Sequence, residues 1–335
     1  MPDPELVEVF RGPRVESRHA GALAVADADG GLVLALGDVE RPVFPRSAVK
    51  VIQALPLIES GAADRYGLTE AELALACASH SGEPAHAEAA ASMLRKAGLD
   101  RDALECGVHW PSNAEASRAL ARSGAEATAL HNNCSGKHSG FLCSACARGE
   151  AVAGYVLPEH PVQRAVKAAM DEVTGFTARE EDRGTDGCSI PTYAVPLRAL
   201  ALGFARVGTG RGQGPVRAAA FQRLRAAVAA NPFMVAGTGR SDTVLMTALG
   251  PRAFTKVGAE GVFCASLPEL GLGIAIKCDD GAGRAAEVVM ASLLLRLLPL
   301  SDAERAAVEP LARPVLRNWR GIEVGGLRPT EALRH

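Results

Sequence analysis

The chain has 335 residues, of which 48% are hydrophobic and 4% are aromatic, and its formal net charge is -2. This length suits one large domain or two modest ones, and the hydrophobic content is enough for a sizeable buried core. A nearly neutral chain offers no basic surface for nucleic acid or for an anionic membrane, so the composition favours a small-molecule substrate.

The N-terminus and the most apolar stretch both argue against a membrane protein. The first five residues are acidic and lack the basic-then-apolar pattern of a signal peptide, which predicts a cytoplasmic location. The longest apolar stretch, residues 285–300, contains Glu287 and Arg296 and predicts a buried or amphipathic helix. In such a chain, eight cysteines are expected to be thiols or metal ligands, and a disulfide framework is not expected.

The first half of the chain predicts a hairpin followed by helices. Two apolar runs, residues 22–26 and 32–36, flank a turn signal and predict a β-hairpin. A helix is expected from Pro45 to Gly61, with a kink at Pro56. Further helices are predicted by the capping box Thr69–Glu72 and at residues 84–97 and 161–174.

The second half mixes helices and strands. Its patterns predict helices at residues 190–205 and 216–230, strands at 246–256, 262–266 and 272–278, and a C-terminal helix ending at Leu297. This order predicts an α+β fold in which one antiparallel sheet is built from both ends of the chain and flanked by helices, as a single domain over residues 1–335.

Two serine–lysine couples are candidates for nucleophilic catalysis. Ser47 and Lys50 stand at i and i+3 at the start of a predicted helix, so the amine can reach the hydroxyl and take its proton. Ser79 lies in a polar loop, and Lys256 lies at the end of a predicted strand in a Lys-x-Gly sequence. Ser-x-x-Lys, a serine loop and Lys-x-Gly follow one another in this order in serine β-lactamases and penicillin-binding proteins.

A second cluster predicts a metal site. Cys134, Lys137 and His138 fall on one face if their segment is helical, and a turn at Asp186 and Cys188 adds a second thiol. Two thiols with a nitrogen ligand suit zinc. Coordination chemistry alone favours His138 over Lys137 as the nitrogen ligand, because a lysine binds metal only when it is neutral. The alternative is that both cysteines are buried thiols.

These stretches together resemble the L-asparaginase II family of the Rhizobium-type, zinc-associated class. The most specific is the string His-Asn-Asn-Cys-Ser-Gly-Lys-His at residues 131–138. The other resembling stretches are Arg46–Lys50, Ala78–Glu83, Pro158–Gln163, Asp186–Cys188 and Lys256–Gly261.

The resemblance implies a fold similar to serine β-lactamases, a homodimer, and hydrolysis of L-asparagine to L-aspartate and ammonia. It implies that the catalytic residues are Ser47, Lys50, Ser79 and Lys256, and that Cys134, Lys137 and Cys188 bind Zn²⁺, with His138 close by. Arg46 and Asp186 match positions that line the pocket, and these two residues and His138 are expected to hold the substrate. One departure is Ser189, where the family usually has glycine, and it is expected to alter the turn that holds Cys188.

The expected mechanism starts with neutral Lys50 taking the proton of Ser47, which then attacks the side-chain amide. Ser79 and Lys256 would relay the proton to the leaving ammonia or polarise the attack. Two alternatives stay open: another serine hydrolase of the β-lactamase type, and a non-catalytic zinc or thiol sensor that uses the two cysteines.

Overall fold

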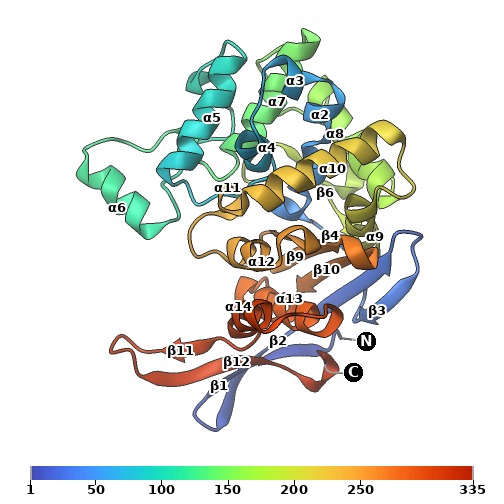
Figure 1. Ribbon diagram of the computed structural model, residues 1–335, viewed down its shortest axis with the longest axis vertical. Helices are drawn as coiled ribbons and strands as arrows, with labels where there is room; N and C mark the ends of the chain where they lie inside the picture. The colour runs from blue at the N-terminus through green and yellow to red at the C-terminus, as the bar shows by residue number, and fades with distance from the viewer. Residues whose placement is uncertain (1, 334–335) are drawn as a thin grey trace.

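The computed structural model describes residues 2–333 and contains one long antiparallel sheet with helices on both faces (Figure 1). The strand order is β11-β12-β1-β2-β10-β9-β8, and β3 pairs with a free side of β2. The strands of this sheet are β1 (Glu5–Arg11), β2 (Arg14–Asp27), β3 (Leu32–Leu36), β8 (Phe254–Val257), β9 (Val262–Leu267), β10 (Leu272–Cys278), β11 (Val315–Arg317) and β12 (Glu323–Pro329).

Strand β2 pairs with strands from both the N-terminal and the C-terminal parts of the chain. Its first half pairs with β1, and its second half pairs with β10 and β3. Because side chains alternate along a strand, Ala22, Ala24 and Ala26 pack into the core of the helical lobe, whereas Leu23 and Val25 pack into the core on the opposite face. Both faces of the central sheet are therefore covered.

The two faces are covered by different helices. Helix α9 (Leu197–Thr209) lies between the sheet and the helical lobe, and α13 (Gly283–Leu297) and α14 (Asp302–Ala312) lie on the opposite face (Figure 1). The other helices, apart from α12, form the lobe above α9: α1 (Lys50–Gln53), α2 (Leu55–Glu59), α3 (Ala62–Arg65), α4 (Glu70–Ala76), α5 (Pro84–Lys96), α6 (Ala114–Arg122), α7 (Ser135–Arg148), α8 (Pro161–Thr174), α10 (Pro215–Ala230) and α11 (Pro232–Ala236). Helix α12 (Ser241–Leu249) packs between α11 and α14 and against β8.

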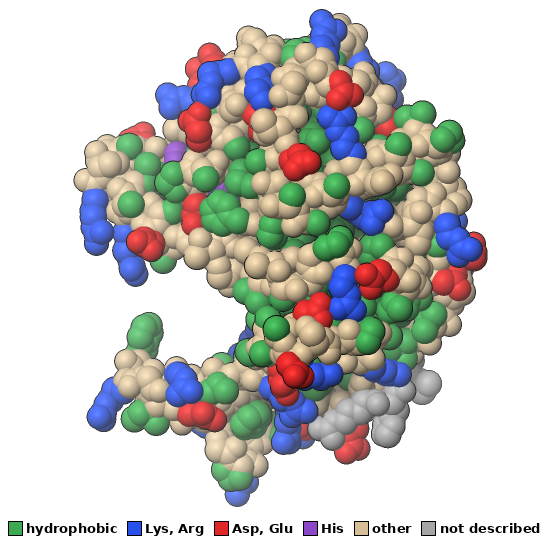
Figure 2. All heavy atoms as spheres, in the orientation of Figure 1, with side chains coloured by type: hydrophobic (Ala, Val, Ile, Leu, Met, Phe, Trp, Pro, Cys, Tyr) green, Lys and Arg blue, Asp and Glu red, His purple; other side chains and the backbone are tan. Residues whose placement is uncertain are grey.

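The sheet end that carries β11 and β12 projects from the body. A broad notch separates it from the part of the lobe that carries α6 (Figure 2).

Two short ribbons lie away from the main sheet: β4 (Pro42–Val43) with β7 (Val195–Pro196), and β5 (Arg183–Thr185) with β6 (Pro191–Tyr193). Between residues 2 and 333, no helix combines the length and the apolar content needed to cross a bilayer.

The predicted α+β class with a flanked antiparallel sheet is confirmed, as are the hairpin, the capping box at Thr69 and most helices. Three segments differ from the prediction. The helix expected from Pro45 to Gly61 is divided into the 3₁₀ turn η1 (Arg46–Val49), α1 and α2, with the break at Ala54. Residues 246–249 belong to α12, because an apolar run of this length fits a buried helix as well as a strand. Residues 190–196 form β6 and β7, and helix begins only after Pro196. None of the eight cysteines forms a disulfide.

Candidate active site

Both predicted nucleophiles line one pocket, with a volume of about 310 Å³. Ser47 comes from the 3₁₀ turn η1 (Arg46–Val49), and Ser79 comes from the loop between α4 and α5. The segment after β8 forms another wall, and the backbones meet closely there: a Cβ on Gly258 would lie 2.6 Å from the carbonyl oxygen of Pro45. The pocket therefore joins segments that are about 200 residues apart in sequence.

Lys50 is fully buried, and its amine is surrounded by acceptors. Its Nζ donates to the carbonyl oxygens of Ala78 (2.6 Å) and Asn133 (3.3 Å) and to Sγ of Cys134 (3.1 Å). Three acceptors match the three N–H donors of an ammonium group.

The residue before Ser47, Arg46, has a positive φ of 52°, a conformation that is costly for a residue with a side chain.

Ser79 is fixed from two sides. Its backbone N–H donates to the carbonyl oxygen of Val235 (2.9 Å), and its hydroxyl accepts a hydrogen bond from Nδ2 of Asn133 (3.1 Å). Asn133 also lines the pocket, and it is held by the bond from its own N–H to Nε2 of His109 (2.8 Å). The hydroxyl of Ser79 is thus presented to the pocket in a defined position.

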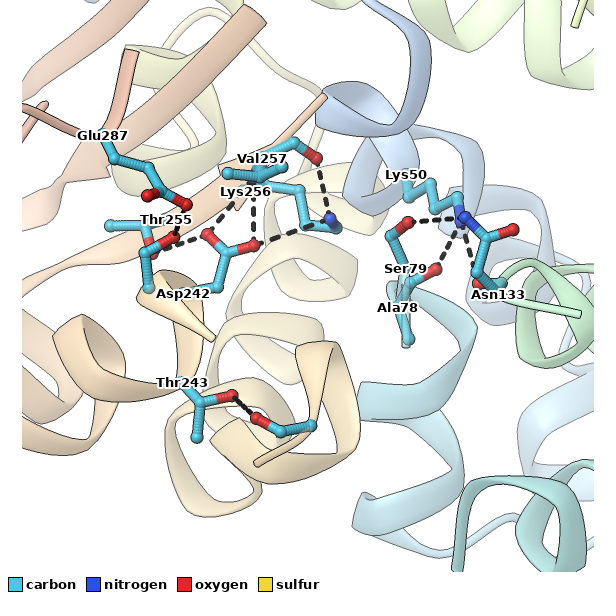
Figure 3. A network of polar contacts seen from close by, with 12 residues as sticks. Lys50, Ala78, Ser79, Asn133, Asp242, Thr243, Thr255, Lys256, Val257 and Glu287 are labelled. Atoms are coloured by element: carbon cyan, nitrogen blue, oxygen red, sulfur yellow. Dashed lines mark hydrogen bonds and ion pairs between the residues drawn. The ribbon is translucent and has the colours of Figure 1, made fainter. Parts of the chain in front are cut away.

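Lys256 is the lysine best prepared to act as a base. It is fully buried at the end of β8, and its Nζ donates to the carbonyl oxygen of Val257 (2.9 Å). Burial, together with the positive charges of Lys50 and Arg240, lowers the pKa of Lys256 to about 8, although Asp242 opposes this shift. Figure 3 shows the Lys256 and Lys50 amines on either side of the Ala78–Ser79 segment in this view, with the Lys50 amine directed toward Asn133.

Cys134 and Cys188 form a buried sulfur pair beside two lysines. Nζ of Lys50 lies 3.1 Å from Sγ of Cys134, and Nζ of Lys137 lies 3.2 Å from Sγ of Cys188. A hydrogen bond from the Cys188 thiol, and then the charges of both lysines, hold the pKa of Cys134 well below its usual range. The neighbouring sulfur and burial instead raise the pKa of Cys188.

The donors of this sulfur pair fit zinc. Sulfur and nitrogen are its usual ligands, and the lowered pKa of Cys134 favours the thiolate form that binds a metal. Burial would lower the pKa of Lys137, but Cys188, Cys134 and Asp186 together raise it, so a metal would have to displace the proton of this amine. Across residues 2–333, no group of three His, Cys, Asp or Glu side chains could hold a metal, so the third protein ligand here would have to be Lys137.

The three residues expected to hold the substrate do not line the pocket. Arg46 and Asp186 bind each other, with Nε 2.7 Å from Oδ1. Burial opposes ionisation of Asp186, yet Lys137 and Arg46 keep the pKa of its carboxyl below the usual value. The ring of His138 is fully buried, with Nδ1 2.7 Å from the Tyr155 hydroxyl, and its Nε2 has no hydrogen-bond partner in the described part of the chain. Their contact with substrate stays a prediction.

Ser189 is accommodated in the turn that positions Cys188. It adopts a positive φ of 76°, which explains why glycine suits this position. The turn still closes, because the N–H of Ser189 donates to Asp186 O and the N–H of Asp186 donates to Ile190 O, both at 2.9 Å. The expected alteration is therefore local backbone strain in an intact turn.

The sequence reasoning missed Arg240, His109 and Asn133 as pocket residues. Asn133 could have been found, because it lies inside the specific string at residues 131–138. Arg240 follows Gly237-Thr238-Gly239, a stretch that resembles any flexible loop, and His109 lies in a segment without periodicity. Only the fold brings these two side chains to the serines.

Comparison with known proteins supplies a family. A model described as L-asparaginase II matches residues 7–329. No curated protein matches the sequence. Among solved structures, a β-lactamase from Mycobacterium bovis is 15% identical with a TM-score of 0.39, covering 87% of this chain and 94% of that chain. Mglu in its native form is 16% identical with a TM-score of 0.38, covering 84% of this chain and 66% of that chain. Both scores are low, so the fold description depends on the sheet and helices themselves.

Proposed function

Because the chain belongs to the L-asparaginase II family, we propose that it hydrolyses the side-chain amide of L-asparagine, giving L-aspartate and ammonia. The observation that carries this proposal is the shared pocket of Ser47 and Ser79 beside Lys256, a buried amine with a pKa of about 8. A hydroxyl attacks an amide only when a base removes its proton, and a lysine with a lowered pKa is such a base.

The contacts favour different roles for the two lysines from those expected from the sequence. The three acceptors around Lys50 suit its ammonium form, in which it holds Ala78, Asn133 and Cys134 in place. Lys256 is better suited to accept the proton of Ser47. In this proposal Ser47 attacks the amide carbon, the protonated amine of Lys256 gives its proton to the leaving ammonia, and water then hydrolyses the acyl-enzyme with Lys256 as base.

Ser79 and Asn133 would support this reaction from the opposite wall. The amide of Asn133 donates to the hydroxyl of Ser79, which leaves the Ser79 proton free to be donated to a substrate oxygen. A donor fixed before the reaction stabilises developing negative charge without reorganisation. Ser79 therefore has the position of a hydrogen-bond donor or proton relay.

We also propose that Cys134, Cys188 and Lys137 hold a zinc ion. Bound zinc would supply a fixed positive charge behind the pocket wall. Cys134 directly follows Asn133, so a metal bound there would stabilise the wall that carries Asn133.

A homodimer and a cytoplasmic location stay predictions. What supports association is Trp319, which is fully exposed in the turn between β11 and β12, with Val315 and Ile322 about half exposed nearby. Protein interfaces commonly bury such aromatic side chains. Light scattering of the purified protein would give the number of chains, and cell fractionation would give the location.

The decisive experiment for the activity is ammonia release from L-asparagine by the purified protein, with and without added zinc. A chromogenic β-lactam serves as the comparison substrate. Ammonia release without β-lactam hydrolysis supports the proposal. Turnover of the β-lactam alone would identify a different hydrolase, and no turnover of either substrate would leave the pocket without the proposed activity.

A further inference from the structure

Arg240 is the cation of the pocket that has no partner of its own. Of the residues from 2 to 333, it is the one lysine or arginine that lines the pocket, and no aspartate or glutamate lines it. Its half-buried side chain makes no hydrogen bond or ion pair within this part of the chain. An arginine that faces a cavity unpaired leaves a planar set of donors available for an anionic ligand.

The other arginine near the site is already occupied. Nε of Arg46 binds Oδ1 of Asp186 at 2.7 Å, and neither residue lines the pocket. For Arg46 to bind a substrate carboxylate, it would have to give up at least part of this contact. Arg240 needs to break no such pair.

The loop that carries Arg240 is tied to the loop that carries Ser79. Glu83 joins them: its Oε1 accepts from the hydroxyl of Ser81 (2.6 Å) and the N–H of Thr238 (2.8 Å), and its Oε2 accepts from the hydroxyl of Thr238 (2.8 Å). The backbone of Gly237 also packs closely against the side chain of Ser81, since a Cβ on Gly237 would lie 1.9 Å from Oγ of Ser81. Arg240 is thus placed on a wall whose position relative to Ser79 is fixed before ligand binds.

We propose that Arg240 binds the α-carboxylate of the substrate and selects amides that carry a free carboxylate. This inference rests on the proposed amidohydrolase function and names its specificity-determining residue. A guanidinium pairs with a carboxylate through two parallel N–H···O bonds, which fix direction as well as distance. The amide at the other end of a short amino acid is then directed toward the serines. Neutral amides without a carboxylate gain nothing from this contact and bind poorly.

The test compares two substrates in two variants. L-asparagine carries the α-carboxylate, and β-alaninamide has the same amide and amine but lacks it. For Arg240→Gln we expect kcat/KM for L-asparagine to fall about 100-fold, mainly through KM, as for a lost hydrogen-bonded charge contact. The value for β-alaninamide should change less than about threefold, and Arg240→Lys should recover part of the loss.

Arg225→Gln is the matched control. Arg225 is also half-buried and also makes no hydrogen bond or ion pair within residues 2–333, but it lines a different cavity beside Phe254. Its substitution should leave kcat/KM for both substrates unchanged. Equal losses for both substrates in Arg240→Gln would overturn the proposal, because they would indicate a structural effect.

A binding measurement separates this inference from the proposed activity. Titration calorimetry with L-aspartate, which carries the same α-carboxylate, needs no turnover. If the wild-type protein releases no ammonia but binds L-aspartate, and Arg240→Gln abolishes binding, then the activity fails and the carboxylate site stands. If the wild-type protein does not bind L-aspartate, or if Arg240→Gln binds it equally well, the carboxylate site is refuted.

Discussion

The amine of Lys256 lies 3.8 Å from Oδ2 of Asp242, and both side chains are almost completely buried. At this distance the carboxylate acts on the amine mainly through its charge, because its direct hydrogen bonds come from Thr255 and from the N–H of Val257. Asp242 raises the pKa of Lys256, while burial and two cations lower it to about 8. The balance leaves an amine that loses its proton near physiological pH (Figure 3).

Removing the charge of Asp242 should shift the pH dependence to lower pH. If neutral Lys256 is the base, kcat/KM of the wild-type protein rises with pH through about 8. Asp242→Asn removes an influence that raises this pKa, so the rising limb should move to lower pH. A pH profile of kcat/KM checks this, with Asp102→Asn, an exposed carboxylate, as control. A shift to higher pH would contradict the prediction.

Lys256→Met should remove the base altogether. General-base catalysis typically contributes ~10²–10⁴-fold, so we expect a loss of kcat in this range. The rising limb near pH 8 should also disappear, which a merely misfolded fraction would not produce. Steady-state kinetics across pH would measure both effects. If the rise in activity near pH 8 remained unchanged in Lys256→Met, a group other than Lys256 would be responsible for it.

Ser47→Ala should reduce kcat on the order of a thousandfold or more, because residues that act together as nucleophile and base fail together. Ser79→Ala should cost less, since Ser79 is proposed to donate a hydrogen bond or relay a proton. Mass spectrometry of protein quenched during turnover should show an aspartyl adduct in the wild type and none in Ser47→Ala. Near-normal turnover of Ser47→Ala would transfer the nucleophilic role to Ser79.

Removal of zinc should raise KM more than it lowers kcat. Cys134, Lys137 and Cys188 do not line the pocket, so a bound ion would hold the wall without touching the reacting atoms. The metal content of purified protein, measured by emission spectroscopy, should fall in Cys188→Ser and stay unchanged in Cys146→Ser, which alters a thiol outside the cluster. A large fall in kcat with constant KM would argue for direct catalysis by the metal.

Ser189→Gly should stabilise the protein. A side chain in the left-handed region costs roughly 1–2 kcal/mol, and the added freedom of the unfolded chain offsets about 0.4–1 kcal/mol of this. We expect a net gain of about 0.5–1 kcal/mol in the free energy of unfolding, measured by urea denaturation. Ser117→Gly, in helix α6, should instead destabilise the protein, because φ is negative there. Destabilisation by Ser189→Gly would show that the turn depends on the serine side chain.

The sequence patterns predicted the elements that are specified by residues close together in the chain. The hairpin at residues 22–36 and the helix after Thr69 are specified by turn and capping residues close in sequence. Strands β11 and β12 and the short ribbons were missed, because their stability comes from partners far along the chain. Residues 246–249, the last turn of α12, do not show a helical period in sequence, because a short apolar run fits a buried helix and a strand equally well.

The site could be predicted to the extent that its residues lie in short, dense motifs. Ser47, Lys50 and Cys134 belong to such motifs. Arg240 is placed by the loop that Glu83 anchors, and no pattern around residue 240 indicates this. The lowered pKa of Lys256 also could not be predicted from spacing, because it depends on burial and on charges contributed by separate elements.

The close approach of Gly258 to Pro45 has a consequence for redesign of this enzyme. Even one methyl group at position 258 would clash with the carbonyl oxygen of Pro45. The clash would move β8, which carries Lys256, away from η1, which carries Ser47. Libraries aimed at new substrates can therefore vary Val257 and Ala259 on either side, but they should leave this glycine fixed.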